Sequence, residues 1–511
     1  MNDAVKETLL ASVYDVAINS PLEPARKLSD RLGCAVLLKR EDLQPVHSFK
    51  LRGAYNKIAR LSAAERAAGI ITTSAGNHAQ GVALSAQKLG ISALIVMPQT
   101  TPTIKVEAVK SYGAKVELAG DNYSDAAEHG KRRAAETGRT YVHPFDDPLV
   151  IAGQGTIGRE LLEQEPGLTH IFVPVGGGGL IAGIAQYVKA LRPEVKIISV
   201  EPEDSNVLQT SLEAGKRVVL PHVGIFADGV AVKQMGELTF EICRKLVDDC
   251  LIVTTDELCA GIKSIFEETR SIVEPAGALG VAGVTKYRAA HPDEPMTAIA
   301  ICSGANMTFE RLQFITERTL LGSGKEAVFA VTLDEKPGTL ERLCRNIIQG
   351  HNITQFGYRL HTRGSAHVFV GVTVTGPDDK ATFAEKLAGQ GYEFTDLSGD
   401  GTAKEHIRYM IGGRSPEAKD ERLYRLAFPD RPGALDDFLR RLGTTWNISL
   451  FHYRGMGGDT GRVLIGFEAS DAGALEAKIA ATGCDFKPVT SAAARIFLGV
   501  ETSIVTKSGA K

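Results

Sequence analysis

The sequence predicts an α/β region followed by a smaller α+β region, and two patterns along the chain support this. Over roughly the first 320 residues, short apolar runs that end in Gly, Ser or Pro alternate with segments of helical periodicity. Such alternation is typical of a mainly parallel sheet covered by helices. Beyond residue 325 the alternation stops and a duplicated unit begins.

The apolar runs of the first region are candidate buried strands because they are short and bounded by turn residues. They are CAVLLKRE (34–41), GIITTSAG (69–76), SALIVMP (92–98), AKVELAG (114–120), THIFVPVGGGG (169–179), VKIISVEPE (195–203) and PMTAIAICSGAN (295–306). Parallel sheets bind ligands at the carboxyl ends of their strands. Several polar and glycine-rich segments fall at those positions.

The second region contains an internal repeat. Residues 327–359 align with residues 422–454 at a constant offset of 95, without a gap, and nine of the 33 positions are identical. Each copy has the pattern strand, Pro-Gly turn, amphipathic helix, Asn turn, strand. We therefore expect two α+β modules, at 327–398 and 421–492. At ~70 residues each is small for an independent domain, so the two are expected to pack on each other.

Composition excludes several classes of protein. The 511 residues correspond to two to four domains of ~100–200 residues. The net charge of −3, from 58 basic and 61 acidic residues, gives no basic face for nucleic acid. The N-terminus has no signal-peptide pattern, and no apolar stretch reaches the ~18 residues of a membrane span. The seven scattered cysteines form no C-x-x-C pair. We therefore expect a cytoplasmic protein with reduced thiols.

The segment HSFKLRGAYN (47–56) contains Lys50 within small and aromatic residues. Taken alone, the segment leaves two interpretations open. Lys50 is either an exposed lysine of an ordinary amphipathic segment, which is the commoner case, or an amine used for covalent chemistry.

The segment IFVPVGGGGLIAGIAQYV (171–188) predicts a phosphate-binding turn. An apolar strand runs into Gly176, Gly177, Gly178 and Gly179, and an apolar helix starts at Leu180. Backbone amides at such a turn can bind phosphate because a helix N-terminus attracts anions. A plain flexible turn is the alternative. The chain has no G-x-x-x-x-G-K-[ST] pattern, and the glycines of this turn do not have the G-x-G-x-x-G spacing, so a single-phosphate ligand fits better than a nucleotide here.

Two further strand ends carry polar side chains. In TTSAGNHAQG, Ser74, Gly76 and Asn77 lie between an apolar strand and a helix expected to begin near Asn77, and their position suits a carboxylate or an oxyanion. Simple N-capping explains the same pattern. In AIAICSGANM, Ser303 follows an apolar strand. Its hydroxyl either donates to a ring nitrogen or caps a turn.

Taken together, these segments resemble one enzyme class. SFKLRGA, TSAGNHAQG, PVGGGGL and CSGAN follow the order and spacing of pyridoxal-phosphate enzymes of the tryptophan-synthase β type, or fold-type II. The string KREDLQPVHSFKLRGAYN is similar to threonine and serine dehydratases, and the repeats resemble the ACT-like regulatory modules of biosynthetic threonine deaminases. The resemblance spans nearly the whole chain. It implies a catalytic domain with two parallel-sheet subdomains at 1–325, followed by the two modules.

The resemblance also implies roles for single residues. Lys50 is expected to hold pyridoxal 5'-phosphate as an imine, with Phe49 against its ring and Asn77 on its ring hydroxyl. The turn Gly176–Gly179 and the amide of Leu180 are expected to hold the phosphate. Ser303 is expected to meet the pyridine nitrogen. The substrate carboxylate is expected at Ser74, Ala75, Gly76 and Asn77.

The activity that the resemblance implies is that of a threonine ammonia-lyase. L-threonine would lose water and then ammonia to give 2-oxobutanoate, the first committed step of isoleucine biosynthesis, and L-serine is a possible second substrate. Isoleucine would inhibit, valine would oppose it, and a homotetramer is usual in the family. Two alternatives remain: a racemase or serine-preferring dehydratase, and a non-catalytic amino-acid sensor.

A departure from the related racemases bears on metals. They carry a divalent-metal pattern E-x-x-x-A-x-D, whereas this chain reads EPEDSNV. Glu201 is present, but Val207 replaces the last acidic ligand. We therefore expect no required divalent metal and a lower chance of racemase activity.

The repeat also indicates a candidate effector site. Tyr358-Arg359 recurs as Tyr453-Arg454 at the end of a predicted strand. An arginine there could bind the carboxylate of an amino acid through two parallel hydrogen bonds. A structural role, in which Tyr packs and Arg bridges the modules, explains the same pattern.

Overall fold

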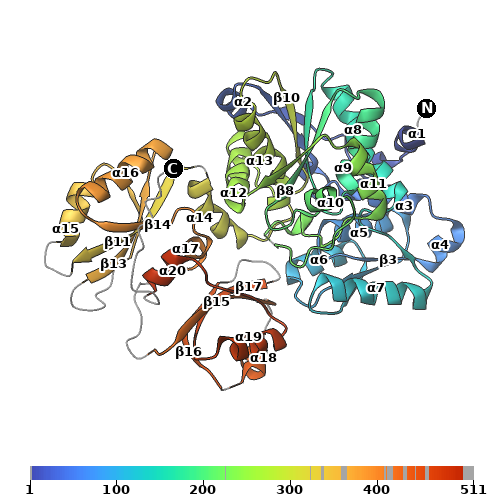
Figure 1. Cartoon of the computed structure of the whole chain (residues 1–511). Helices are drawn as coiled ribbons and strands as arrows, with labels where there is room; N and C mark the ends of the chain where they lie inside the picture. The colour runs from blue at the N-terminus through green and yellow to red at the C-terminus, as the bar shows by residue number, and fades with distance from the viewer. Residues whose placement is uncertain are drawn as a thin grey trace. The chain divides into compact units, whose positions relative to one another are not determined.

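A computed structural model gives the fold of two compact units, Met1–Ile315 and Thr316–Lys511 (Figure 1). It describes residues 3–224, 226–322, 324–334, 339–357, 365–407, 410, 418–429, 434–443, 445–454 and 460–498. The boundary between the units falls inside helix α14 (Arg311–Gly322).

The first unit is built on a six-stranded sheet whose strands pair in parallel, except for β1, which is antiparallel to β2. In spatial order the strands are β1 (Leu22–Pro24), β2 (Ala35–Arg40), β10 (Thr297–Cys302), β7 (His170–Pro174), β8 (Lys196–Pro202) and β9 (Asp249–Val253). The last strand in sequence therefore lies near the middle of the sheet, between β2 and β7.

Helices cover both faces of this sheet (Figure 1). One face packs on α8 (Pro148–Gln164), α9 (Gly179–Leu191) and α11 (Glu237–Leu246), and their apolar side chains join those of the strands in one buried core. The other face packs on α13 (Pro275–Ala290), which itself lies against α12 (Thr255–Thr269). Burial on both faces explains why these strands are continuous apolar runs instead of alternating ones.

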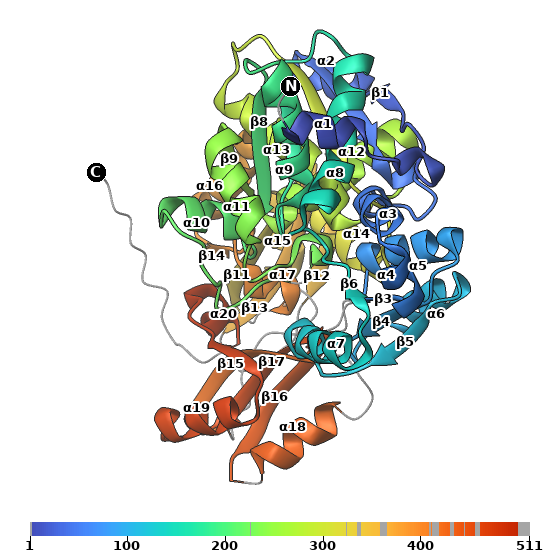
Figure 2. The ribbon, with the colours of Figure 1, turned by 90° about the vertical axis from the view of Figure 1, so that its right-hand side faces the viewer.

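A second, smaller sheet is inserted between β2 and β7. Its strands pair in parallel, in the order β5 (Lys115–Leu118), β4 (Ala93–Met97), β3 (Ile70–Thr73) and β6 (Thr140–Tyr141). Helices α5 (Asn77–Leu89) and α6 (Thr103–Ser111) cover one face, and α7 (Tyr123–Thr137) covers the other (Figure 2). Two parallel sheets thus form the first unit, which confirms the predicted fold class.

The remaining helices of the first unit are short or connect these layers. They are α1 (Asp3–Leu9), α2 (Arg26–Leu32), α3 (Lys50–Ala59), α4 (Ala63–Ala68) and α10 (Val207–Glu213), with 3-10 turns η1 (Val13–Asp15), η2 (Glu41–Leu43) and η3 (Asp228–Val230).

Helix α3 is fixed by a buried charge network beneath it. The Arg52 guanidinium is fully buried and donates to Glu41 Oε1 and Oε2 at 2.8 Å and to Glu160 Oε1 at 2.6 Å. Lys39, also fully buried, donates to Glu160 Oε2 at 2.5 Å and to the carbonyl of Ser20 at 2.8 Å. The network thus ties α3 to β2, to α8 and to the N-terminal segment.

The second unit contains two four-stranded antiparallel sheets of the same topology. In spatial order they are β12 (Ile353–Gly357), β13 (Ser365–Thr373), β11 (Glu326–Asp334) and β14 (Glu393–Asp396), then β16 (Asn447–Arg454), β17 (Thr460–Glu468), β15 (Glu421–Pro429) and β18 (Asp485–Pro488). The helices are α15 (Thr339–Leu343), the π-turn η4 (Cys344–Ile348), α16 (Pro377–Gly389), α17 (Gly401–Glu405), α18 (Ala434–Leu442), α19 (Ala472–Ala481) and α20 (Ala492–Phe497).

The repeat seen in the sequence is reproduced in detail. The pairing register shifts between Ile353 and Gln355 in the first module and between Ile448 and Leu450 in the second, at the same offset of 95 residues. A shared apolar core joins the modules, and the residues just beyond their predicted ends contribute to it, among them Ile407 and Phe497. The predicted α+β tandem is therefore confirmed.

Arg52→Met tests the charge network. Removal of Arg52 leaves the buried Glu41 without its cation and Glu160 with Lys39 alone, so we expect the variant to lose about 3–5 kcal/mol in the free energy of urea-induced unfolding. Arg159→Met is the matched control, because Arg159 pairs with Glu163 on an exposed helix face, and it should cost less than about 1 kcal/mol. Equal losses in the two variants would contradict the structural role of the network.

Candidate active site

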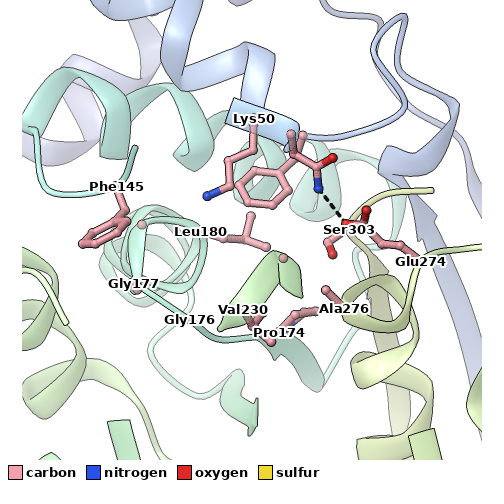
Figure 3. A pocket seen from close by; sticks show the side chains of 15 residues that line it. Lys50, Phe145, Pro174, Gly176, Gly177, Leu180, Val230, Glu274, Ala276 and Ser303 are labelled. Carbon is pink, nitrogen blue, oxygen red and sulfur yellow. Dashed lines mark hydrogen bonds between the residues drawn. The ribbon is translucent and has the colours of Figure 1, made fainter. Parts of the chain in front are cut away.

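A cavity lies where the carboxyl ends of β7 and β10 meet the start of α3 (Figure 3). Its lining comes from segments far apart in the sequence. These residues are Phe49, Lys50, Asn77, Phe145, Pro174, Gly176, Gly177, Gly178, Gly179, Leu180, Gly229, Val230, Glu274, Ala276 and Ser303. All the cofactor-binding positions predicted from the sequence therefore lie around one cavity, since Lys50, Phe49, Asn77, Ser303, the glycine turn and Leu180 line it.

Lys50 is the first residue of α3, and its side chain lines the cavity. Burial lowers the pKa of its amine to about 8, and the nearby Glu274 carboxylate partly opposes that shift. The Phe49 ring centroid lies 5.3 Å from Nζ, and the Phe49 amide donates to the carbonyl of Ser303 at 3.3 Å. A buried amine that is easily deprotonated is the form in which lysine acts as a nucleophile or a base.

The glycine turn leaves amides free toward the cavity. Helix α9 begins at Gly179 with no side-chain cap, and among the described residues the amides of Gly177, Gly178, Gly179 and Leu180 find no protein acceptor. An uncapped helix start of this kind can accept a phosphate.

Neighbouring protein atoms also explain why glycine is needed in this turn. A Cβ on Gly177 would lie 2.2 Å from the Phe145 ring, and one on Gly176 would lie 2.8 Å from Val230 Cα. Gly178 has a φ of 90°, which side chains rarely adopt. The close approach of neighbouring protein atoms therefore requires glycine here, in addition to any approach of a ligand.

Asn77 and Ser303 face the cavity from two other elements. Asn77 begins α5, as predicted, and its Nδ2 donates to Glu274 Oε1 at 2.6 Å. Ser303 follows β10 directly and is buried. Ser74, Ala75 and Gly76 are half-buried between β3 and α5, beside Asn77 but outside the cavity lining. Space around Gly76 is open, since an added Cβ would meet nothing within 4 Å.

A charge cluster supports the loop behind the cavity. The Asp228 carboxylate accepts from Lys105 Nζ at 2.8 Å and lies 3.2 Å from Arg311 Nη1. Burial alone would raise the pKa of Asp228, but the two cations outweigh burial and hold it at about 2. Since Gly229 and Val230 follow Asp228 and line the cavity, the cluster fixes one wall.

Sequence reasoning missed several lining residues, above all Glu274 and Phe145. Glu274 precedes Pro275 at the start of α13, and its burial raises its carboxyl pKa to about 7. A lone acidic residue in the apolar, glycine-rich segment IVEPAGALG was the available signal. No sequence signal indicated Phe145, because an aromatic residue in a loop does not show which glycine it contacts.

The candidate effector residues cannot be assigned contacts. Tyr358 and Arg359 lie outside the described residues. Tyr453 and Arg454 end β16, where their backbones pair with Val463 and Arg462 of β17, and their side chains lie outside the described part of the structure.

The carboxylate of Glu201 is already hydrogen-bonded within the protein. Its carboxylate accepts from the amides of Leu208 and Gln209 at 2.8 and 2.9 Å, at the start of α10. Within the described ranges, no three His, Cys, Asp or Glu side chains are grouped to hold a metal ion. In the same ranges, the helices are all too short or too polar to cross a membrane.

Comparison with known proteins agrees with this geometry. The family model "Pyridoxal-phosphate dependent enzyme" matches residues 13–304, and "C-terminal regulatory domain of Threonine dehydratase" matches residues 317–407 and 412–497. The biosynthetic L-threonine dehydratase IlvA of Burkholderia multivorans is 52% identical over 97% of this chain and 99% of its own. The Escherichia coli enzyme of the same name is 48% identical over 91% of each chain.

Solved structures resemble about three fifths of the chain. The processed form of threonine deaminase isoform 2 from Solanum lycopersicum is 49% identical, with a TM-score of 0.61, and covers 62% of this chain and 92% of its own. Maize serine racemase is 34% identical, with a TM-score of 0.58, and covers 62% of this chain and 97% of its own.

Gly177→Ala tests the packing of the turn. The new methyl group must displace the Phe145 ring from the cavity wall, so we expect affinity for pyridoxal phosphate to fall at least about tenfold, or about 1.4 kcal/mol, in equilibrium titration. The double variant Gly177→Ala/Phe145→Ala should recover much of that loss. Gly389→Ala, at an exposed glycine with open space around it, should leave the affinity for pyridoxal phosphate unchanged. A double variant as weak as the single one would refute this explanation.

Proposed function

Because the chain belongs to the biosynthetic threonine dehydratases, which are pyridoxal-phosphate-dependent enzymes, we propose that it converts L-threonine to 2-oxobutanoate and ammonia. The observation that carries the proposal is the identity of 52% over 97% of the chain. The cavity supports it independently, since it brings a buried amine and an uncapped glycine turn together. A non-catalytic sensor would need neither.

The cavity residues fit pyridoxal phosphate. The free amides from Gly177 to Leu180 would hold the phosphate, and Lys50 would carry the aldehyde carbon. Phe49 would pack on the ring, Asn77 would donate to the ring oxygen, and Ser303 would meet the ring nitrogen. When bound, the cofactor supplies an electron sink for the substrate.

The protein groups then divide the remaining tasks. The amine of Lys50, once the incoming amine of threonine has displaced it from the aldehyde carbon, would take the proton from Cα of threonine, and its lowered pKa keeps a usable neutral fraction near pH 7. The segment Ser74–Asn77, before α5, holds the substrate carboxylate and orients Cα toward Lys50. Because the Ser74 amide donates to the carbonyl of Val96 and the Gly76 amide to Ser74 Oγ, the donors offered to the carboxylate are the amides of Ala75 and Asn77 and the Ser74 hydroxyl. A serine hydroxyl at position 303 is too weak an acid to protonate a ring nitrogen. That favours elimination of the β-hydroxyl over side reactions that need a longer-lived carbanion.

A second candidate activity follows from the likeness to maize serine racemase. L-serine fits the same chemistry, because it differs from L-threonine by one methyl group. Deamination of each amino acid, followed as keto-acid formation, separates a threonine enzyme from a serine-preferring one. Formation of D-serine would identify a racemase.

We extend the proposal to the pathway and to control. The reaction would be the first committed step of isoleucine biosynthesis, carried out in the cytoplasm by a homotetramer. Isoleucine would inhibit and valine would oppose it. The match of the second unit to a threonine-dehydratase regulatory domain supports an effector site there. We assign that site to Arg454 or its repeat partner Arg359, with the neighbouring Tyr453 and Tyr358.

Reduction with borohydride tests Lys50. We expect the reduced cofactor on the peptide that contains Lys50, and a label on any other lysine would contradict the assignment. The rate of attachment should also rise with pH. With an amine pKa of about 8 the neutral fraction is about a tenth at pH 7 and nearly complete by about pH 9, whereas an ordinary lysine would still be protonated there. A rate that rises only above about pH 10 would contradict the buried-amine assignment.

Two variants test the regulatory assignment. Arg454→Ala should leave activity without effector nearly unchanged but raise the isoleucine concentration for half-inhibition about 5–150-fold, the range of allosteric couplings of 1–3 kcal/mol. Removal of residues 327–511 should abolish inhibition. A shortened enzyme that stays active and is inhibited at the original isoleucine concentration would show that the sensor lies elsewhere.

A further inference from the structure

We propose that Glu274 is a positioning residue of the cavity, which fixes the orientation of the Asn77 amide. The inference deepens the proposed function and rests on it, because it concerns how this cavity receives pyridoxal phosphate. It follows from a directed chain of hydrogen bonds that ends on Glu274.

The chain of hydrogen bonds can run in only one direction. Asn306 Nδ2 donates to the carbonyl oxygen of Val46 and to Asn77 Oδ1, both at 2.7 Å. Since a carbonyl only accepts, the nitrogen of Asn306 must lie on that side. Asn77 therefore turns its oxygen to Asn306 and its nitrogen to Glu274, which accepts at 2.6 Å. The ionised carboxylate is an acceptor only, so both ends of the chain agree.

The orientation decides what Asn77 offers to a ligand. One of its two amide hydrogens is taken by Glu274, and its oxygen is taken by Asn306. The second hydrogen is left for the cavity, which Asn77 lines. A lone donor there binds an ionised ring oxygen better than a neutral hydroxyl. If the amide were reversed, its oxygen would face the ligand and repel that charge.

The side chain of Glu274 binds Asn77 and does not cap its own helix, α13. It is the N-cap residue of α13, yet its side chain makes no capping bond. Ser, Thr, Asp and Asn are the usual residues there because their short side chains reach the free amides. The Glu274 amide donates to the carbonyl of Gly304 at 3.1 Å, and a Cβ on Gly304 would lie 2.7 Å from Glu274 Oε1. The carboxylate is therefore packed beside the segment that carries Ser303.

The surrounding charges make Glu274 sensitive to pH near neutrality. Burial raises its carboxyl pKa to about 7, with a further rise from Asp228, while the Asn77 hydrogen bond and the more distant Lys105 and Arg311 act against that rise. The negative charge of Glu274 also acts on the Lys50 amine of α3, where it partly opposes the lowering of the Lys50 pKa by burial. Below about pH 7 the carboxyl takes a proton, so Asn77 loses its charged acceptor and Lys50 loses its anionic neighbour.

The test compares Glu274→Ala, Glu274→Gln and Glu201→Gln with the wild type. Two measurements are made: affinity of the apoprotein for pyridoxal phosphate, and the absorption spectrum of the bound cofactor between pH 5.5 and 9, a range chosen to span the transition expected at about pH 7. Glu201 is the matched control because it is also buried, with a carboxyl pKa of about 7, but lies outside the cavity lining.

We expect Glu274→Ala to weaken cofactor affinity about tenfold or more and to shift the absorption of the bound cofactor, because the Asn77 amide is released. Glu274→Gln should recover most of the affinity, since its side-chain oxygen can still accept from Asn77. It should lose the spectral transition near pH 7, because it cannot ionise. Glu201→Gln should match the wild type in both measurements.

Two results would overturn the inference while leaving the proposed function intact. One is a Glu274→Ala protein with wild-type affinity and spectrum. The other is a Glu274→Gln protein that keeps the transition near pH 7. A Glu274→Ala protein that fails to fold leaves the decision to Glu274→Gln. If the wild type bound no pyridoxal phosphate and released no keto acid from threonine, the proposed function and the inference would both be wrong.

Discussion

The buried charge network beneath α3 is the constraint on which the cavity depends. Arg52 lies two residues after Lys50 on the same helix and is held by Glu41 and Glu160 in two other segments. Buried ion pairs add little net stability, because desolvation offsets most of the attraction. Their geometry is strict, however, and a short helix anchored by several short bonds cannot slide or rotate. Lys50 is thereby held at a fixed place in the cavity wall.

The two carboxyl groups near the cavity, Asp228 and Glu274, ionise at different pH because their surroundings differ. Asp228 lies between two cations and remains ionised over the whole ordinary pH range. Glu274 accepts from the Asn77 amide, and no ion pair joins it to a cation of the described residues, so its charge changes near neutral pH. The carboxylate of Asp228, behind one wall of the cavity, therefore keeps its negative charge. The carboxyl group of Glu274, beside Asn77, gains or loses its charge near neutral pH.

Local sequence patterns were sufficient to predict the fold, whereas the residues expected around the cavity were predicted only when the patterns were combined with the family resemblance. The strand ends at Gly176 and Ser303 could be located because a parallel sheet brings such ends together, and the repeat gave the second unit. Partners across long sequence separations could not be predicted. Nothing near Arg52 indicates that Glu160 will bind it, and Glu274 acquires its role only when α13 places it against Asn77. The glycines show the same limit, since Phe145, which makes Gly177 necessary, lies on a distant loop.

The position of β10 has a consequence for how the chain assembles. This strand lies between β2 and β7, yet it is the last strand of its sheet to be synthesised. Until residues 297–302 leave the ribosome, β2 and β7 each lack a neighbour along one edge, and such unpaired edges promote aggregation. The smaller sheet is complete by residue 141 and can form earlier. Folding of the catalytic unit should thus begin with the inserted subdomain and end with the strand that delivers Ser303, so the cavity forms only when nearly the whole unit is present.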